Sequence, residues 1–186
     1  GGVQVDRPCK GELPIEVRVF QGMPKQLSKF EEVLKHGTEL GATQFYPLLT
    51  ANCEAEELKK RTRMEHILKE SAEQSERGRI PVLGPEVRLK DILESGWPEG
   101  LEAEVTLFAY AREEKALLSE VLGNMGSPKS VNIVIGPEGG FTDEEVEGAH
   151  EQHWTVFGMG PRILRTETAA PAILSALLLG SFSSLK

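Results

Sequence analysis

The stretch VNIVIGPEGGF, residues 131–141, joins a short apolar run to a loop rich in glycine. Four of its first five residues are β-branched, and turn-forming residues bound the run, which predicts a short buried strand. Gly136, Gly139 and Gly140 follow where that strand ends. Ligands bind at the carboxyl ends of strands in α/β proteins, and glycine lets the main chain approach them closely. The stretch therefore predicts a ligand-binding loop, with an ordinary tight turn before a capped helix as the alternative.

The residues around these glycines argue against a phosphate-binding loop. A P-loop requires Gly-x-x-x-x-Gly-Lys-Ser/Thr and a dinucleotide fold requires Gly-x-Gly-x-x-Gly, and neither pattern matches GPEGG at 136–140. The next residues predict a capping box between Thr142 and Glu145, with Asp143 and Glu144 in the first helical turn. Because that helix end already carries negative charge, the loop favours a neutral or cationic ligand. A phosphate-binding NTPase is therefore the weakest alternative.

Composition limits the class of protein. The chain has 186 residues, 39% of them hydrophobic and 27% charged, which is typical of one globular domain or one domain with a small appendage. No apolar run approaches the ~20 residues that a membrane span needs. Cys9 and Cys53 are isolated and the four histidines are scattered, so we expect no metal site, no disulfide framework and a reducing compartment.

The net charge of -8 opposes a simple nucleic-acid interpretation, since contacts from Lys and Arg to phosphates supply much of the affinity in such complexes. An RNA-related role would have to rest on local basic patches or on a partner domain. One candidate patch contains Lys59, Lys60, Arg61 and Arg63. Such a cluster is more often a solvated helix face than an RNA-facing surface, and both interpretations stay open.

Strand-like and helix-like segments alternate along the chain, which predicts an α/β fold with a mostly parallel sheet covered by helices. Apolar and β-branched runs predict strands at 15–20, 44–49, 104–110, 131–135 and 154–157. Apolar residues at helical spacing predict helices over 27–40 and 58–68, and further helices fit 91–95, 112–122, 142–150 and 167–179.

A second glycine loop repeats the logic of the first. Gly158 and Gly160 follow the strand at 154–157. Because proline is tolerated only in a first helical turn, Pro171 indicates that the next helix begins near 166–168. Parallel strands bring their carboxyl ends to one edge, so we expect both loops to face the same rim.

Charged residues follow this second loop. Arg162 and Arg165 can hold an anionic substrate or polarise a base carbonyl, with Glu167 fixing one of them by a charge-assisted hydrogen bond. The alternative is a structural Arg–Glu pair that ties the loop to its helix.

Four motifs together resemble the RsmE family of ribosomal RNA methyltransferases, which methylate N3 of a uridine in small-subunit rRNA: IGPEGGFTDEEV, GPRILRTETAAPA, AEQSERGRIP and TELGATQFYPL. The similarity runs from about residue 15 to 180. It implies a SPOUT methyltransferase domain over 15–186 with a C-terminal trefoil knot, S-adenosylmethionine bound in the knot, and a homodimer. Residues 1–14 would then be a remnant or linker in place of the family's small RNA-binding β-barrel domain. The expected location is the cytoplasm, or an organelle with ribosomes in a eukaryote.

The resemblance also assigns roles to residues. Arg165 and Arg162 would stabilise negative charge on the deprotonated base, with Glu167 orienting Arg165, and no histidine is an obvious base. The two glycine loops and the strand end at 108–112 would form the cofactor pocket. The expected cofactor-binding residues are Phe108, Ala109, Tyr110, Ala111, Gly136, Pro137, Glu138, Gly139, Gly140, Phe157, Gly158, Met159, Gly160, Ile163, Leu164, Arg165, Thr168 and Ala169.

Two segments depart from the family pattern. The family tends to show Lys-Gly-Asp-Lys where this chain reads MPKQLSK, with Lys25 and Lys29 kept in part. It also shows Arg-Ser where Asn52 and Cys53 stand. These departures leave donor binding untouched and concern rRNA recognition. They favour two alternatives, a non-catalytic knotted RNA-binding or assembly protein and a methyltransferase for another RNA.

The C-terminal helix predicts contact with a second chain. It is apolar nearly all round, so it must be buried on more than one side. We expect its small residues to pack within the chain, and its leucines, Leu177 and Leu178 among them, to be covered by a second copy. This predicts a homodimer through the C-terminal helix and the face next to it, with substrate RNA crossing the dimer.

Overall fold

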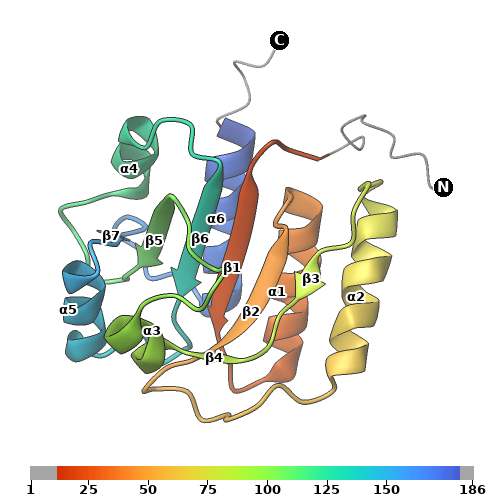
Figure 1. Ribbon diagram of the computed structural model, residues 1–186, viewed down its shortest axis with the longest axis horizontal. Coiled ribbons are helices and arrows are strands. Elements are labelled where there is room, and N and C mark those ends of the chain that lie inside the picture. Colours follow the sequence, from red (N-terminus) through yellow and green to blue (C-terminus); the bar gives the residue numbers. More distant parts are fainter. Residues whose placement is uncertain (1–11, 181–186) are drawn as a thin grey trace.

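The computed structural model describes residues 12–180 and shows a seven-stranded sheet in the order β3-β2-β1-β6-β5-β7, with β4 also paired to β2 (Figure 1). Each described strand pairing is parallel, so the predicted fold class is confirmed in its main features. Most of the expected 1–14 remnant, and Cys9 with it, lies outside the described residues. The strands are β1 (Glu16–Gly22), β2 (Gln44–Leu49), β3 (Val82–Leu83), β4 (Val87–Arg88), β5 (Val105–Ala109), β6 (Ser130–Ile135) and β7 (Thr155–Phe157).

Helices cover both faces of the sheet. Figure 1 shows α1 (Leu27–Leu40) and α6 (Thr166–Gly180) behind the strands, with α2 (Arg61–Gln74) beside α1 at one edge of the sheet. Two shorter helices, α3 (Leu89–Ser95) and α5 (Asp143–Glu151), pack on the opposite face. The last helix, α4 (Leu118–Asn124), lies beside α6 and β7.

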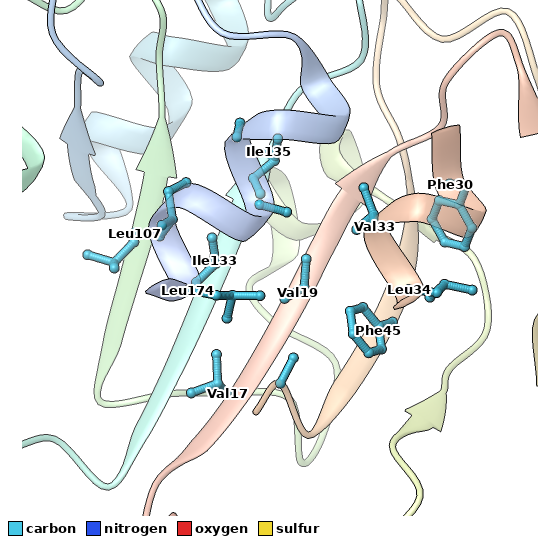
Figure 2. Close-up of a cluster of buried hydrophobic side chains, with 14 of the residues drawn as sticks. Val17, Val19, Phe30, Val33, Leu34, Phe45, Leu107, Ile133, Ile135 and Leu174 are labelled. Carbon is cyan, nitrogen blue, oxygen red and sulfur yellow. The ribbon is translucent and has the colours of Figure 1, made fainter. Parts of the chain in front are cut away.

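Alternation along the strands builds two hydrophobic cores. On β1, Val17 and Val19 face α1 and α6, whereas Phe20 faces the opposite core with Tyr46 and Trp154. Figure 2 shows the first core, where side chains of β1, β5 and β6 meet those of α1 and α6. Because both faces are covered, the central strands β1 and β6 are buried along nearly their whole length rather than alternating with solvent-facing residues, and their few polar side chains, such as Gln21 and Asn132, are buried too.

The parallel sheet places the two glycine loops side by side. β6 ends at Ile135 and β5, its neighbour, ends at Ala109, while β7 pairs with β5 and ends at Phe157. All three strands point the same way, so their following loops emerge at one edge of the sheet. The expectation that both loops face the same rim is confirmed.

Some element boundaries differ from the prediction. The helix expected from residue 112 begins only at Leu118, because residues 110–117 run alongside β7 and its following residue. β3 and β4 were not predicted, since two residues are too few to show a period. α6 begins at Thr166 as expected, but Pro171 lies inside the helix beyond its first turn, where it removes one N–H bond of the helical ladder.

The structure contradicts the packing argument for the dimer. Leu177 and Leu178 are each 1% exposed and belong to the core between α6, α1 and the sheet. They are therefore covered by their own chain and need no second copy. Only the outward side of the helix is open, and its large apolar residue there is Leu179, which is 67% exposed.

Candidate functional site

A cleft of about 330 Å³ lies between the two glycine loops at the carboxyl ends of the strands. Residues predicted for the site supply most of its lining, from three separate segments of the chain. They are Ala109, Ala111, Gly136, Pro137, Glu138, Gly140, Met159, Arg162, Ile163, Leu164, Arg165, Glu167 and Ala169.

The other predicted residues do not line the cleft. Phe108 and Phe157 are fully buried in the cores below it. Gly158 is enclosed by neighbouring main chain, and Thr168 is exposed on the first turn of α6. Tyr110, Gly139 and Gly160 also fall outside the lining, although each adjoins a residue that belongs to it.

Sequence reasoning missed four lining residues, Lys29, Ile135, Phe141 and Thr166. Ile135 and Phe141 directly flank the first glycine loop, so adjacency alone is a sufficient signal for them. Lys29 comes from the first turns of α1 and was associated with RNA recognition rather than with this pocket. Thr166 is buried and lies where α6 begins.

The first glycine loop, residues 136–140, is tied to the loop after β2. The Asn52 side-chain amide donates to the carbonyl oxygens of Gly139 and Gly140, each at 3.1 Å. The Ala51 main-chain N–H donates to a Glu145 carboxylate oxygen at 2.8 Å, and Glu145 also closes the predicted capping box with Thr142. The segment that departs from the family pattern therefore supports the cleft wall.

A buried chain of hydrogen bonds joins the first loop to the second. Gln21 Nε2 donates to Thr166 Oγ1 at 2.6 Å, and Thr166 Oγ1 donates to the Gly136 carbonyl oxygen at 2.6 Å. Gln21 is fully buried and Thr166 is 7% exposed. These bonds fix the start of α6 against the end of β6, which sets the spacing of the two walls.

Three charged side chains lie together at the inner side of the cleft. Lys29 Nζ donates to Glu138 Oε1 at 3.1 Å and lies 3.9 Å from Glu167 Oε2. Glu138 also accepts the Lys25 main-chain N–H. Burial alone would raise the pKa of Glu138, but hydrogen bonds from its own main-chain N–H and from Lys29 and Lys25 hold that pKa below its ordinary value.

The predicted partner of Glu167 is wrong. In the described part of the chain, the charged group beside its carboxylate is Lys29, and the structure shows no hydrogen bond or ion pair between Glu167 and Arg165. Arg162 and Arg165 are exposed at the mouth of the cleft. They are free to meet a group that approaches from solvent.

The second glycine loop, residues 158–165, begins in a tight passage and then opens. Gly158 donates its N–H to the Ala116 carbonyl oxygen at 2.8 Å and accepts from the Leu118 N–H at 3.1 Å. Beyond Gly160 the chain is mostly exposed, and Ile163 is 80% exposed although it lines the cleft. One wall therefore presents apolar side chains to solvent.

This geometry suits a small cationic ligand with an apolar body. Main-chain groups and apolar side chains form most of the lining, two carboxylates share Lys29 within it, and Arg162 and Arg165 lie exposed at its mouth. Within residues 12–180, no group of three or more His, Cys, Asp or Glu side chains is placed to hold a metal ion. No helix in the same range is long and apolar enough to cross a membrane.

The basic cluster at 59–63 is largely engaged in intramolecular contacts or solvated. Arg63 makes two hydrogen bonds with the Glu31 carboxylate, and Arg61 donates to the carbonyl oxygens of Leu83 and Gly84. Lys59 and Lys60 are exposed. The solvated-face interpretation fits this arrangement better than an RNA-facing patch.

Comparison with known proteins identifies a family and relatives that this chain resembles. The family model described as an RNA methyltransferase domain matches residues 11–178. The ribosomal RNA small subunit methyltransferase E of Bacillus subtilis is 37% identical over 175 residues, covering 89% of this chain and 66% of the relative. Its Synechocystis counterpart is 34% identical over 170 residues, covering 90% of this chain and 54% of the relative. The chain thus spans between about half and two thirds of the length of these relatives.

Solved structures agree with this assignment. A putative methyltransferase from Legionella pneumophila, in complex with the bound cofactor SAM, superposes with a TM-score of 0.78 at 28% identity, covering 91% of this chain and 68% of that one. The ribosomal RNA small subunit methyltransferase E of Neisseria gonorrhoeae, bound to S-adenosyl methionine, gives a TM-score of 0.75 at 28% identity, covering 89% and 66%. The resemblance drawn from the motifs is confirmed, and the chain belongs to the RNA methyltransferase domain family, with RsmE proteins among its relatives.

Proposed function

We propose that this chain binds S-adenosylmethionine in the cleft between its two glycine loops and transfers the methyl group to N3 of a uridine in small-subunit ribosomal RNA. The observation that carries the proposal is the cleft itself, whose lining is mostly main chain and apolar side chains, with two carboxylates that share Lys29 and with Arg162 and Arg165 exposed at its mouth. S-adenosylmethionine is a cation at sulfur without phosphates, so it suits such a lining. The relatives' names and the donor bound in two structural neighbours support the same activity.

The protein's part in the reaction is to orient the donor and stabilise the base. Bound S-adenosylmethionine supplies an electrophilic methyl group, and N3 attacks it only after losing its proton. Arg165, with Arg162 beside it, lies exposed at the cleft mouth where it can stabilise the negative charge that develops on the base. Holding donor and base in line lowers the entropic part of the barrier. Glu167 forms no hydrogen bond or ion pair with Arg165, so we assign it a role elsewhere in the site.

The trefoil knot forms part of this proposal, and the passage of Gly158 supports it. Gly158 pairs with Leu117 in a parallel bridge, and a Cβ at Gly158 would lie 1.9 Å from the Glu113 carbonyl oxygen. The chain then continues into α6, which packs against α1 and the sheet. A knot here would require the segment after β7 to cross residues 110–118, and the bridge brings these two segments together.

A homodimer is also proposed, through the outward side of the C-terminal helix and the neighbouring α4 rather than through Leu177 and Leu178. α4 has no buried residue, yet its side carries the partly exposed Leu118, Val121 and Leu122. Leu179 and small residues of α6 lie on the outward side of that neighbouring helix. A second copy on α4 and the outward side of α6 would cover this apolar surface.

Methyl transfer to isolated ribosomal subunits tests the function. The protein is incubated with S-adenosylmethionine labelled in its methyl group and with small subunits from a strain that lacks this modification. We expect label in small-subunit rRNA, recovered as 3-methyluridine after digestion, and a large loss of turnover in Arg165→Ala. Unchanged turnover in Arg165→Ala would contradict the role of Arg165.

A methyltransferase for another RNA is the second candidate. It is favoured by Asn52, which stands where the family shows arginine and whose amide is committed to the glycine loop rather than directed to solvent. Donor binding with methyl transfer to total RNA but none to small subunits would support this candidate. Donor binding without transfer to any RNA would support the non-catalytic alternative.

A further inference from the structure

One carboxylate oxygen in the cleft is buried without a hydrogen-bond partner. Among the described residues, three buried side-chain atoms lack a partner, and they are Arg18 Nε, Gln21 Oε1 and Glu167 Oε2. Glu167 alone among the three residues lines the cleft. Its side chain is only 11% exposed. A buried carboxylate oxygen without a hydrogen-bond partner lowers the stability of the folded chain unless a ligand supplies that partner.

The nearest cation does not satisfy this oxygen. Lys29 Nζ lies 3.9 Å away, which exceeds a hydrogen-bond distance. The same ammonium group donates to Glu138 Oε1 at 3.1 Å. Two carboxylates therefore share one lysine, and the closer contact belongs to Glu138. The inner end of the cleft has capacity for one more positive charge.

Two other roles fit Glu167 less well. It does not orient Arg165, because these side chains form no hydrogen bond or ion pair in the structure. A role as the base that deprotonates the uridine requires a carboxylate at the open mouth of the cleft, where RNA would approach. Glu167 Oε2 is buried instead, and its side chain is only 11% exposed.

We propose that the Glu167 carboxylate binds a positively charged group of the methyl donor, either the sulfonium or the ammonium of its amino-acid part. This inference rests on the proposed function, since it assumes that S-adenosylmethionine occupies the cleft. Lys29 positions the carboxylate through their mutual attraction, and Glu138 keeps Lys29 from pairing fully with it. When the donor binds, its cationic group pairs with the unpartnered carboxylate oxygen, and this pairing contributes to the binding free energy.

Calorimetric titration of the wild-type chain and Glu167→Gln with three ligands tests the inference. S-adenosylmethionine carries both positive groups, S-adenosylhomocysteine keeps only the ammonium, and 5′-methylthioadenosine has neither. We expect Glu167→Gln to bind S-adenosylmethionine about tenfold or more weakly, as for loss of a hydrogen bond to a charged group. We expect its affinity for 5′-methylthioadenosine to be unchanged. If the sulfonium is the partner, S-adenosylhomocysteine binding is unchanged, and if the ammonium is, it weakens equally.

Thermal unfolding without ligand separates this role from a structural one. A carboxylate that holds the fold together would leave Glu167→Gln with a lower Tm. If the carboxylate instead serves to bind a cationic ligand, Glu167→Gln should have the same Tm as wild type or a higher one, because the substitution removes a charge without a hydrogen-bond partner. Glu147→Gln is the matched control, since it makes the same change at an exposed position on α5. Glu167→Asp, which keeps the charge on a shorter side chain, should recover part of the affinity.

The outcomes distinguish the inference from the proposed function. If the wild-type chain binds no S-adenosylmethionine, the proposed function fails and the inference fails with it. If the wild-type chain binds the donor and Glu167→Gln binds it within about twofold, the inference alone is overturned. An equal loss for all three ligands would also overturn it, because the carboxylate would then act on the shape of the cleft rather than on charge.

Discussion

The two glycine loops occupy the same edge of the sheet but are held very differently. Residues 136–140 are fixed by Asn52, by the Lys25 main-chain N–H and by Thr166, each from a different part of the chain. Residues 158–165 are fixed at Gly158 and are mostly exposed beyond it, with Ile163 at 80%. The first loop is therefore held along its length by hydrogen bonds, whereas the second loop is held mainly where it begins and where α6 follows it.

This contrast suggests that the two loops contribute differently, one to donor affinity and the other to the stability of the fold. A wall that is hydrogen-bonded on all sides can position a ligand before it arrives, which lowers the cost of ordering on binding. A wall that exposes apolar side chains gains buried area only when a ligand or a second chain covers it. We therefore expect changes in the first loop to act on donor affinity and changes at the anchors of the second loop to act on the fold.

The largest effect is expected at the tight passage of the second loop. A Cβ at position 158 would lie 1.9 Å from the Glu113 carbonyl oxygen, and main chain cannot move aside as a side chain can. Gly158→Ala should therefore destabilise the protein by about 3 kcal/mol or more, measured by urea unfolding. Gly160→Ala is the matched control, because nothing lies near its Cβ and only its φ of 95° opposes alanine. It should cost about 1 kcal/mol, and equal costs at both positions would refute the tight passage.

A smaller loss of stability is expected when the hydrogen bond between Gln21 and Thr166 is removed. Thr166→Val keeps the shape of the side chain but leaves Gln21 Nε2 without its bond to the hydroxyl, and Gln21 is fully buried. We expect a loss of about 2 kcal/mol in unfolding free energy and weaker donor binding. Thr168→Val makes the same change at an exposed position two residues further along α6 and should change stability by less than about 0.5 kcal/mol. Similar losses in both variants would show that the buried bond contributes nothing.

Asn52 offers a test of the first loop alone. Asn52→Ala removes both hydrogen bonds to the Gly139 and Gly140 carbonyl oxygens at an exposed site, so the fold should be little affected. Donor affinity should fall about fivefold, equivalent to about 1 kcal/mol, in a calorimetric titration. Asn124→Ala, at an exposed position at the end of α4, should leave affinity unchanged. A loss of stability without a loss of donor affinity would contradict the expectation that the first loop acts on affinity.

The smallest effect is a pH dependence of the first loop. The pKa of Glu138 lies below its ordinary value of 4.5 because hydrogen bonds outweigh burial. Its contribution to stability is therefore present above the ordinary pKa and is lost as the pH falls through the lowered one. We expect Glu138→Gln to have a lower Tm than wild type at about pH 6 and the difference to shrink toward about pH 3. A difference that stays constant across this range would show that the Glu138 charge is not involved.

Sequence reasoning found the parts of the site that adjoin a motif. The glycine loops follow apolar runs, and the parallel sheet brings such strand ends together, so their meeting could be predicted. The partners of the charged residues could not. Lys29 and Glu138 are 109 positions apart, and only the packing of α1 beside α6 places that lysine at the cleft. Arg165 appeared the natural partner of Glu167 because the two are close in sequence.

The dimer argument failed for a related reason. The apolar character of α6 shows that the helix is buried, but it does not show how much of its surface its own chain covers. α1 and the sheet together cover the side that carries Leu177 and Leu178. When a helix is packed between other elements of its own chain, apolar residues all around it do not show that a second chain covers it.

The central claim is that the methyl donor binds between the two glycine loops. Backbone amide signals of the isotopically labelled protein, followed by NMR during titration with S-adenosylmethionine, test it directly. We predict saturable shifts concentrated at residues 136–141 and 158–169, with small changes in the second hollow between α3 and α5, which is lined by Arg88, Asp91 and Glu144 among others. Absence of saturable shifts, or shifts centred on that second hollow, would contradict the account.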